Sequence, residues 1–243
     1  PGTISFGTPI QYPTLIDIRA KLHVADIDTD GKPDILVGYS SDLGNDSLSI
    51  YRNTSTTRAI SLENPTNIFI ETDARPWHIK TNDFDGDGKL EVVVANLTGG
   101  ISVLKNNSRV GDISLTIQAG LETIAETSVQ PNDFQLKDID NDGYVDIVGS
   151  YQNMAHFGVV RTISTMIDSA MFESPLSFGA IPGTLSGYED IKTEDFNSDG
   201  KLDVVTLRRN TIAVYENQVR NAPVISSLSS YAANAGENIT IRG

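Results

Sequence analysis

One acidic loop recurs four times along the chain and constrains its fold more than any other feature. Each copy starts with Asp, carries Asp or Asn at position 3 and Asp-Gly at positions 5 and 6, and ends on a carboxylate at position 9. The copies occupy residues 26–34, 83–91, 138–146 and 195–203, so their first positions are 57, 55 and 57 residues apart. A recurrence this regular indicates an array of similar structural units.

The segments on both sides of each loop are predicted to be strands. They are short, apolar and rich in β-branched residues, and they lack the 3.6-residue period of a helix. The segments before the loops are residues 22–24, 79–81, 134–136 and 191–193. The segments after the loops are residues 35–37, 92–94, 147–148 and 204–205. Each loop therefore joins two strands.

Two further strands are predicted in most units. A third follows a polar turn at residues 48–51, 101–104, 159–160 and 212–215, and in three units it ends on an asparagine, Asn53, Asn106 or Asn217. A fourth is predicted at residues 60–62, 113–115 and 176–178. Four short antiparallel strands per unit of about 56 residues are typical of a β-propeller blade. The predicted fold is all-β, a propeller of four-stranded antiparallel blades with four blades in this chain.

The two ends of the repeat leave the blade number open. Residues 4–6 look like another copy of the fourth strand, and the last unit lacks a fourth strand of its own. The N-terminal strand could therefore close a four-bladed ring, or the chain could be part of a larger propeller of six to eight blades. We assign residues 1–220 to the blades. Residues 221–243 resemble the opening strands of an IPT/TIG immunoglobulin-like domain, of which only the start is present.

The loop chemistry favours calcium. Side chains at positions 1, 3 and 5 converge when the chain turns tightly at the position 6 glycine, and calcium prefers six to eight hard oxygen ligands. An EF-hand would need a glutamate at position 12 and flanking helices. Position 12 is Val37, Val94, Gly149 or Thr206 here, and the flanks are strands. These loops are therefore not EF-hands.

With its strand flanks, the nine-residue loop resembles the FG-GAP/VCBS repeats, a family that includes the propeller heads of integrin α-subunits. The resemblance implies about four calcium ions, one per repeat, held by side chains at positions 1, 3, 5 and 9 and by the position 7 carbonyl. The first two sites would be Asp26, Asp28, Asp30, Lys32 and Asp34, and Asp83, Asp85, Asp87, Lys89 and Glu91. The third and fourth would be Asp138, Asp140, Asp142, Tyr144 and Asp146, and Asp195, Asn197, Asp199, Lys201 and Asp203. Because Asn197 removes one charge, the fourth site is expected to be the weakest.

Net charge, cysteine content and the length of apolar runs exclude several classes of function. The formal net charge is −14, and the four loops hold 15 of the 32 acidic residues, so nucleic-acid binding is not expected. Cysteine is absent, and no apolar run is long enough for a membrane-spanning helix. Weak acidic calcium sites would fill only at extracellular calcium levels, which favours a secreted or cell-surface protein.

No catalytic motif is recognisable, so the expected function is a non-catalytic, adhesion-type module that presents a loop face for protein or carbohydrate binding. The alternative is the propeller scaffold of a polysaccharide-active enzyme such as a lyase. In a propeller the ligand face lies opposite the calcium loops. The candidate residues for that face are Asp42, Arg75, Trp77, His78, Met154, His156, Phe157, Tyr188, Arg208 and Arg209.

Overall fold

The chain is all-β throughout the part that its structure, a computed structural model, describes. That part comprises residues 3–14, 19–40, 47–70, 76–96, 100–118, 131–151, 156–166, 169–174, 176–179, 190–208, 211–219, 227–228 and 241–242. Within these residues, no helix is long and apolar enough to cross a membrane.

Four antiparallel sheets follow one another along the chain, one for each acidic loop. The first contains β1 (Arg19–Ala25), β2 (Asp34–Ser40), β3 (Ser47–Tyr51) and β4 (Thr66–Phe69). The second contains β5 (Pro76–Asn82), β6 (Glu91–Asn96), β7 (Ile101–Asn106) and β8 (Leu115–Ile117). The third contains β9 (Pro131–Lys137), β10 (Asp146–Tyr151), β11 (Phe157–Val160) and β14 (Leu176–Phe178). The fourth contains only β15 (Asp190–Glu194), β16 (Asp203–Arg208) and β17 (Thr211–Tyr215).

The first three strands of every unit fall where the sequence predicts them, and the outer strands partly differ. The prediction of a strand at residues 60–62 was wrong: β4 pairs with β3 through Leu48 and Ile68, and Leu62 makes only an isolated bridge. Ile60 is 68% exposed, so its apolar character does not reflect burial in a sheet. β8 starts at Leu115, two residues later than predicted, whereas β14 matches its prediction. A two-stranded insertion, β12 (Thr162–Met166) and β13 (Ser169–Phe172), was not predicted.

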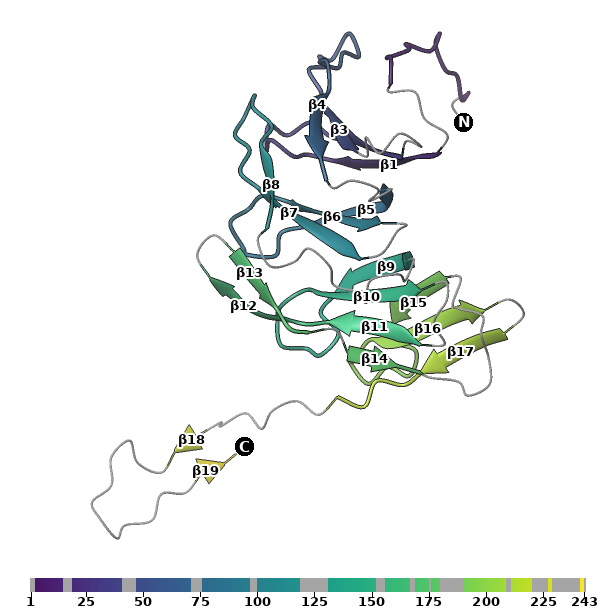
Figure 1. Cartoon of the computed structure of the whole chain (residues 1–243), viewed down its shortest axis with the longest axis vertical. Helices are drawn as coiled ribbons and strands as arrows, with labels where there is room; N and C mark the ends of the chain where they lie inside the picture. The colour runs from purple at the N-terminus through teal and green to yellow at the C-terminus, as the bar shows by residue number, and fades with distance from the viewer. Residues whose placement is uncertain are drawn as a thin grey trace.

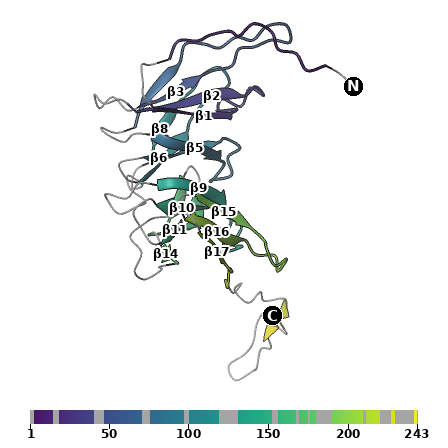
Figure 2. The ribbon, with the colours of Figure 1, turned by 90° about the vertical axis from the view of Figure 1, so that its right-hand side faces the viewer.

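The core lies between consecutive sheets. Figures 1 and 2 show the sheets following one another from the N-terminal to the C-terminal end, with β1, β5, β9 and β15 of successive sheets close together. One buried cluster joins the first and second sheets, a second joins the second and third, and a third joins the third and fourth. β6 is buried along its whole length, because a sheet covers each of its two faces.

No sheet closes the array into a ring in the described residues (Figure 1). Residues 4–6, which resemble a fourth strand in the sequence, form no strand, and Ile4 and Phe6 are 90% and 91% exposed. Of the two alternatives for the blade number, the four-bladed ring closed by this segment is therefore not formed in the described residues. The two end faces are correspondingly apolar and open. Leu22 on β1 and Ile212 on β17 are 67% and 70% exposed, although equivalent positions in the inner sheets are buried.

Little of the expected second domain can be described. In residues 221–243 the structure describes β18 (Ser227–Leu228) and β19 (Ile241–Arg242), which pair antiparallel. The remainder of the predicted immunoglobulin-like segment lies outside the described residues.

Candidate functional site

Each acidic loop connects the first and second strands of its sheet and has the same backbone shape. Position 4 is left-handed in all four loops, with φ values of 57°, 76°, 59° and 62° at Thr29, Gly86, Asn141 and Ser198. Position 6 is also left-handed and is always glycine, with φ between 83° and 93°. Two left-handed residues so close together turn the chain around one centre, and the glycine at position 6 makes the second of them inexpensive.

The position 1 carboxylate binds backbone amides of its own loop. In each loop its Oδ2 accepts the position 6 N–H at 2.8 or 2.9 Å. Its Oδ1 accepts the position 5 N–H at 3.1 Å in three loops, and the Gly86 N–H at 2.7 Å in the second. The loop is therefore folded around this carboxylate before any ion is considered.

The position 9 carboxylate is buried and connects the loop to the third strand. One of its oxygens accepts the N–H of position 2, as Asp34 does from Ile27 at 2.9 Å. The other accepts the N–H of a residue at the end of the third strand or two positions after it, as Asp34 does from Asn53 at 2.8 Å. Burial raises the pKa of Glu91 and of Asp146 to about 7, against the opposing effect of these amides. A carboxylate in this position is costly to ionise unless a cation lies beside it.

In three repeats the position 3 carboxylate is paired with a cation from the end of the third strand. Asp28 Oδ2 accepts from Arg52 Nε at 2.6 Å, and Asp85 Oδ2 lies 3.3 Å from Lys105 Nζ. Arg161 Nε donates to Asp140 in the same way. Burial raises the pKa of Asp28, but its hydrogen bonds to Arg52 and to the Gly111 N–H outweigh burial and leave the pKa below its usual range.

Positions 1, 3 and 9 come together in the first three loops, where one ligand atom from each residue lies within 4.8 Å of the others. The three groups are Asp26, Asp28 and Asp34; Asp83, Asp85 and Glu91; and Asp138, Asp140 and Asp146. These groups offer only carboxylate oxygens, the kind of ligand atom that calcium prefers.

The predicted ligands at position 5 are not among these three groups of converging carboxylates. The position 5 carboxylate accepts the position 7 N–H at 2.8 or 2.9 Å, with donors Lys32, Lys89, Tyr144 and Lys201. In three loops the position 7 lysine also pairs with the position 5 carboxylate, at 3.5 to 3.7 Å. In these three loops the lysine side chain therefore lies against its own loop, and the position 7 carbonyl stays a predicted ligand.

The fourth loop has the same backbone contacts but a different charge pattern. Asn197 Oδ1 accepts the Asp199 N–H at 3.0 Å, and Asp195 and Asp203 bind the same amides as their counterparts. The loop is more open, because no further sheet covers it in the part of the chain that the structure describes. Phe196 at position 2 is 56% exposed, whereas Ile27, Phe84 and Ile139 are buried in the three inter-sheet clusters.

Two asparagines join neighbouring loops, a role that sequence reasoning missed. Asn106 Nδ2 donates to the carbonyls of Ile27, in the preceding loop, and Leu90, in its own, at 2.9 and 3.0 Å. Asn217 Nδ2 repeats this with Ile139 and Leu202, at 2.6 and 3.0 Å. The recurrence of asparagine at the end of the third strand was the available signal.

The face at the other end of the inner strands carries aromatic and charged side chains. Lys21 Nζ lies 4.4 Å from the ring centroid of Trp77, and His78 meets that ring edge-on at 6.1 Å. Asp133 binds Lys192 Nζ at 2.6 Å. Of the predicted ligand residues, Asp42, Arg75, Met154, Tyr188 and Arg209 lie outside the described residues.

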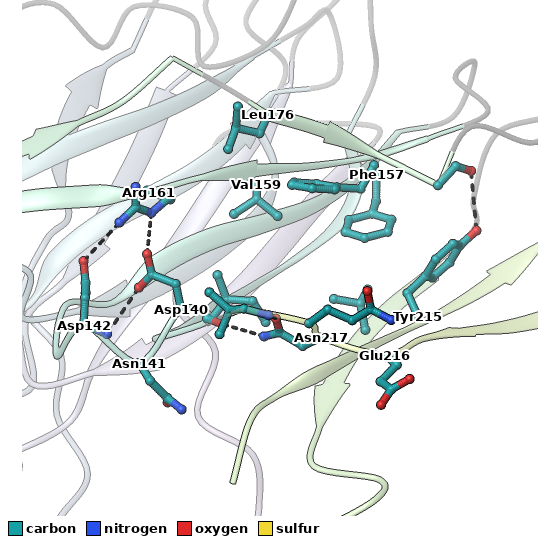
Figure 3. Close-up of a pocket in the computed structure, with 16 residues that line it drawn as sticks. Asp140, Asn141, Asp142, Phe157, Val159, Arg161, Leu176, Tyr215, Glu216 and Asn217 are labelled. Carbon is teal, nitrogen blue, oxygen red and sulfur yellow. Dashed lines mark hydrogen bonds and ion pairs between the residues drawn. The ribbon is translucent and has the colours of Figure 1, made fainter. Parts of the chain in front are cut away.

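A cavity of about 960 Å³ lies between the third and fourth sheets (Figure 3). Its apolar wall includes Phe157 and Tyr215, whose ring centroids are 5.1 Å apart. Its polar end is formed by Asp140 and Asp142 of the third loop and by Arg161, which follows β11, and Figure 3 shows them on the opposite side from Tyr215. The cavity therefore extends from the third acidic loop along the interface of the two sheets.

The recurrence seen in the sequence is matched by a family model. The FG-GAP-like repeat matches residues 26–94 and, again, residues 83–149. The two matches start at position 1 of the first and second loops, and together they span just over half of the 243 residues. A comparison with curated proteins finds no match to the chain.

Proposed function

Because the chain belongs to the FG-GAP-like repeat family, we propose that it is a calcium-binding module of the β-propeller type, with one Ca²⁺ held by each acidic loop. The observation that carries this proposal is the convergence of carboxylates from positions 1, 3 and 9 in three successive loops. When bound, the ion would neutralise these negative charges and hold the first two strands of a unit together.

The buried position 9 carboxylates support the need for a cation. Glu91 and Asp146 are almost inaccessible to water, and each is hydrogen-bonded to two backbone amides. These four amides orient the carboxylates without balancing their charge. A divalent cation would favour the ionised form and so would turn a cost to folding into a stabilising interaction.

We place this module outside the cell, in a secreted or surface protein, with a role in display and none in catalysis. Extracellular calcium modules typically bind with dissociation constants of about 10⁻⁴ to 10⁻³ M, which only extracellular calcium would saturate. The face with Trp77, His78 and Lys21 is the proposed platform for a protein or carbohydrate ligand. Its partly exposed aromatic ring and lysine suit a polar partner.

Thermal unfolding with and without calcium tests the ion-binding proposal. At millimolar calcium, a site with a dissociation constant near 10⁻⁴ M would stabilise the fold by about 1.4 kcal/mol. Four such sites would raise Tm by roughly 10 to 20 °C in a chain of this size. Titration calorimetry should give about four ions per chain. A Tm that is the same in excess calcium and in excess chelator would refute the proposal.

Two variants distinguish calcium binding by an acidic loop from weak attraction of calcium to surface charge. Asp138→Asn removes the position 1 charge of the third loop and is expected to lower the number of bound ions by one. Asp112→Asn removes an exposed carboxylate in a hairpin outside the loops and should leave the number unchanged.

The display role needs a separate experiment. We expect the calcium-loaded chain to bind members of a glycan array or an extracellular protein panel, and Trp77→Ala to abolish binding without changing the calcium-dependent rise in Tm. Binding that survives Trp77→Ala would move the platform elsewhere. Cleavage of an acidic polysaccharide to unsaturated products would contradict the non-catalytic role.

A further inference from the structure

The residue before the end of the third strand differs in charge between repeats, and it does so together with position 3. We take as the end of this segment the residue whose backbone N–H donates to the position 9 carboxylate, which is Asn53, Asn106, Thr162 or Asn217 and lies at the last residue of the third strand or two positions after it. The residues just before it are Arg52, Lys105, Arg161 and Glu216. Three repeats therefore have a cation at this place, and the fourth has a carboxylate.

The three cations bind the position 3 carboxylate, a predicted calcium ligand, of their own loop. Arg52 reaches Asp28 at 2.6 Å, Lys105 reaches Asp85 at 3.3 Å, and Arg161 pairs with Asp140. Arg52 and Arg161 also approach position 5, at 3.3 and 3.5 Å. Each of these loops thus contains an internal positive charge within its acidic cluster, which must oppose a second cation there.

In the fourth repeat both members of the pair are changed. Position 3 is the neutral Asn197, and the partner position is the acidic Glu216. The 2.8 Å bond from the Asn217 N–H to Asp203 fixes the strand end against its loop as in the other repeats. Glu216 is exposed, and in Figure 3 its carboxylate points away from Arg161 and Asp140 of the third loop. Counting position 3 and its partner together, the pair is neutral in three repeats and carries one negative charge in the fourth.

We infer that Glu216 supplies, from the end of the third strand, the negative charge that Asn197 does not supply at position 3 of the fourth calcium site. The inference rests on the proposed calcium binding. It reverses the ranking expected from the loops alone: the fourth site is the one whose neighbouring strand assists cation binding, while the strand ends of the other three sites oppose it.

Each loop contains one backbone amide whose NMR signal can report calcium binding at that loop. The position 6 glycine N–H binds the position 1 carboxylate of its own loop, so the amide signals of Gly31, Gly88, Gly143 and Gly200 should respond each to its own site. The chain has 20 glycines, and labelling them selectively with ¹⁵N gives a spectrum simple enough to follow during a titration with calcium chloride.

The variants should shift the midpoints in opposite directions. Glu216→Gln and Glu216→Arg are expected to raise the calcium concentration at the Gly200 midpoint, by about tenfold for Glu216→Arg, because a unit charge beside a divalent ion changes its binding on this scale. Lys105→Gln should lower the Gly88 midpoint. Asp190→Asn, at the far end of β15 in the same sheet, should leave the Gly200 midpoint unchanged.

The outcomes separate this inference from the proposal beneath it. If no glycine signal responds to calcium, calcium binding itself is refuted. If the signals respond but Glu216→Arg leaves the Gly200 midpoint unchanged, calcium binding stands and the role of Glu216 is overturned. Arg161→Gln, read at Gly143, provides a second test of the opposing cation if Lys105→Gln does not fold.

Discussion

The asparagine that joins two successive loops should contribute more to stability than its counterpart in the first sheet. Asn106 is completely buried; it donates to the carbonyls of Ile27 and Leu90 at 2.9 and 3.0 Å and accepts the Ser108 N–H at 2.9 Å. Asn106→Ala removes all three hydrogen bonds and leaves buried groups unpaired. At about 1 kcal/mol or more for each bond, the free energy of unfolding should fall by roughly 3 to 5 kcal/mol.

Asn53 is the matched control, because it occupies the same position in the first sheet and, among the described residues, binds no loop of another sheet. Its amide donates only to Pro33 O, at 2.8 Å, and its Oδ1 accepts the Ser55 N–H at 2.9 Å, both near solvent. Asn53→Ala should therefore cost about 1 to 2 kcal/mol. Urea unfolding in saturating calcium, followed by the fluorescence of the single tryptophan in β5, would measure both changes. Equal costs for the two variants would refute the inter-sheet role.

Three further predictions concern pH, packing and the loop backbone. Burial, followed by the charge of Lys80, lowers the pKa of His23 below its usual value. The stability contributed by the neutral ring is therefore complete above pH 6.5 and is lost as pH falls below that value, by at most about 1.4 kcal/mol per pH unit. In saturating calcium, the free energy of unfolding of His23→Gln should fall less between pH 7 and pH 5 than that of the unmodified chain. An equal fall in the two proteins would contradict this. Leu104→Ala creates a cavity at a fully buried position between the first and second sheets and should lower the free energy of unfolding by about 2 to 5 kcal/mol in urea. A decrease below about 1 kcal/mol would show that neighbouring side chains fill the cavity. At Gly88, φ is +86° and a Cβ would meet nothing within 4 Å. Gly88→Ala should therefore lower the free energy of unfolding only by the backbone strain, about 1 kcal/mol. A much larger decrease would contradict the open space beside this residue.

Loops and inner strands could be predicted from the sequence because their pattern is local. Alternating apolar residues next to an Asp-Gly turn determine both the strands and their register, and β1, β5, β9 and β15 all contain the predicted segments. The outer strand of the first sheet could not be predicted in this way. Three of the four residues of β4 are exposed, so the strand has no apolar signature, and residues 60–62 offered a stronger pattern without forming a strand.

The charge partners of position 3 were hidden for a different reason. Arg52 lies 24 residues after Asp28, and only the antiparallel pairing of β2 with β3 brings the end of the third strand back to the loop. Three repeats have an asparagine directly after this partner residue, and the third repeat has Thr162 there, so an alignment on that position places Arg52, Lys105, Arg161 and Glu216 in one column. The change from cation to carboxylate at this position is visible in the sequence, but its relation to position 3 depends on the ion pairs seen in the structure.

The residue at position 2 of each loop gives the array a direction. Ile27, Phe84 and Ile139 are each covered by the sheet that follows, and Phe196 is left open because none follows it here. Removing or adding one unit would therefore move the uncovered residue by one repeat and leave every other interface intact. Such an array can change length by duplication while the same two end faces, one at each end, stay uncovered, so growth requires no change to the interior.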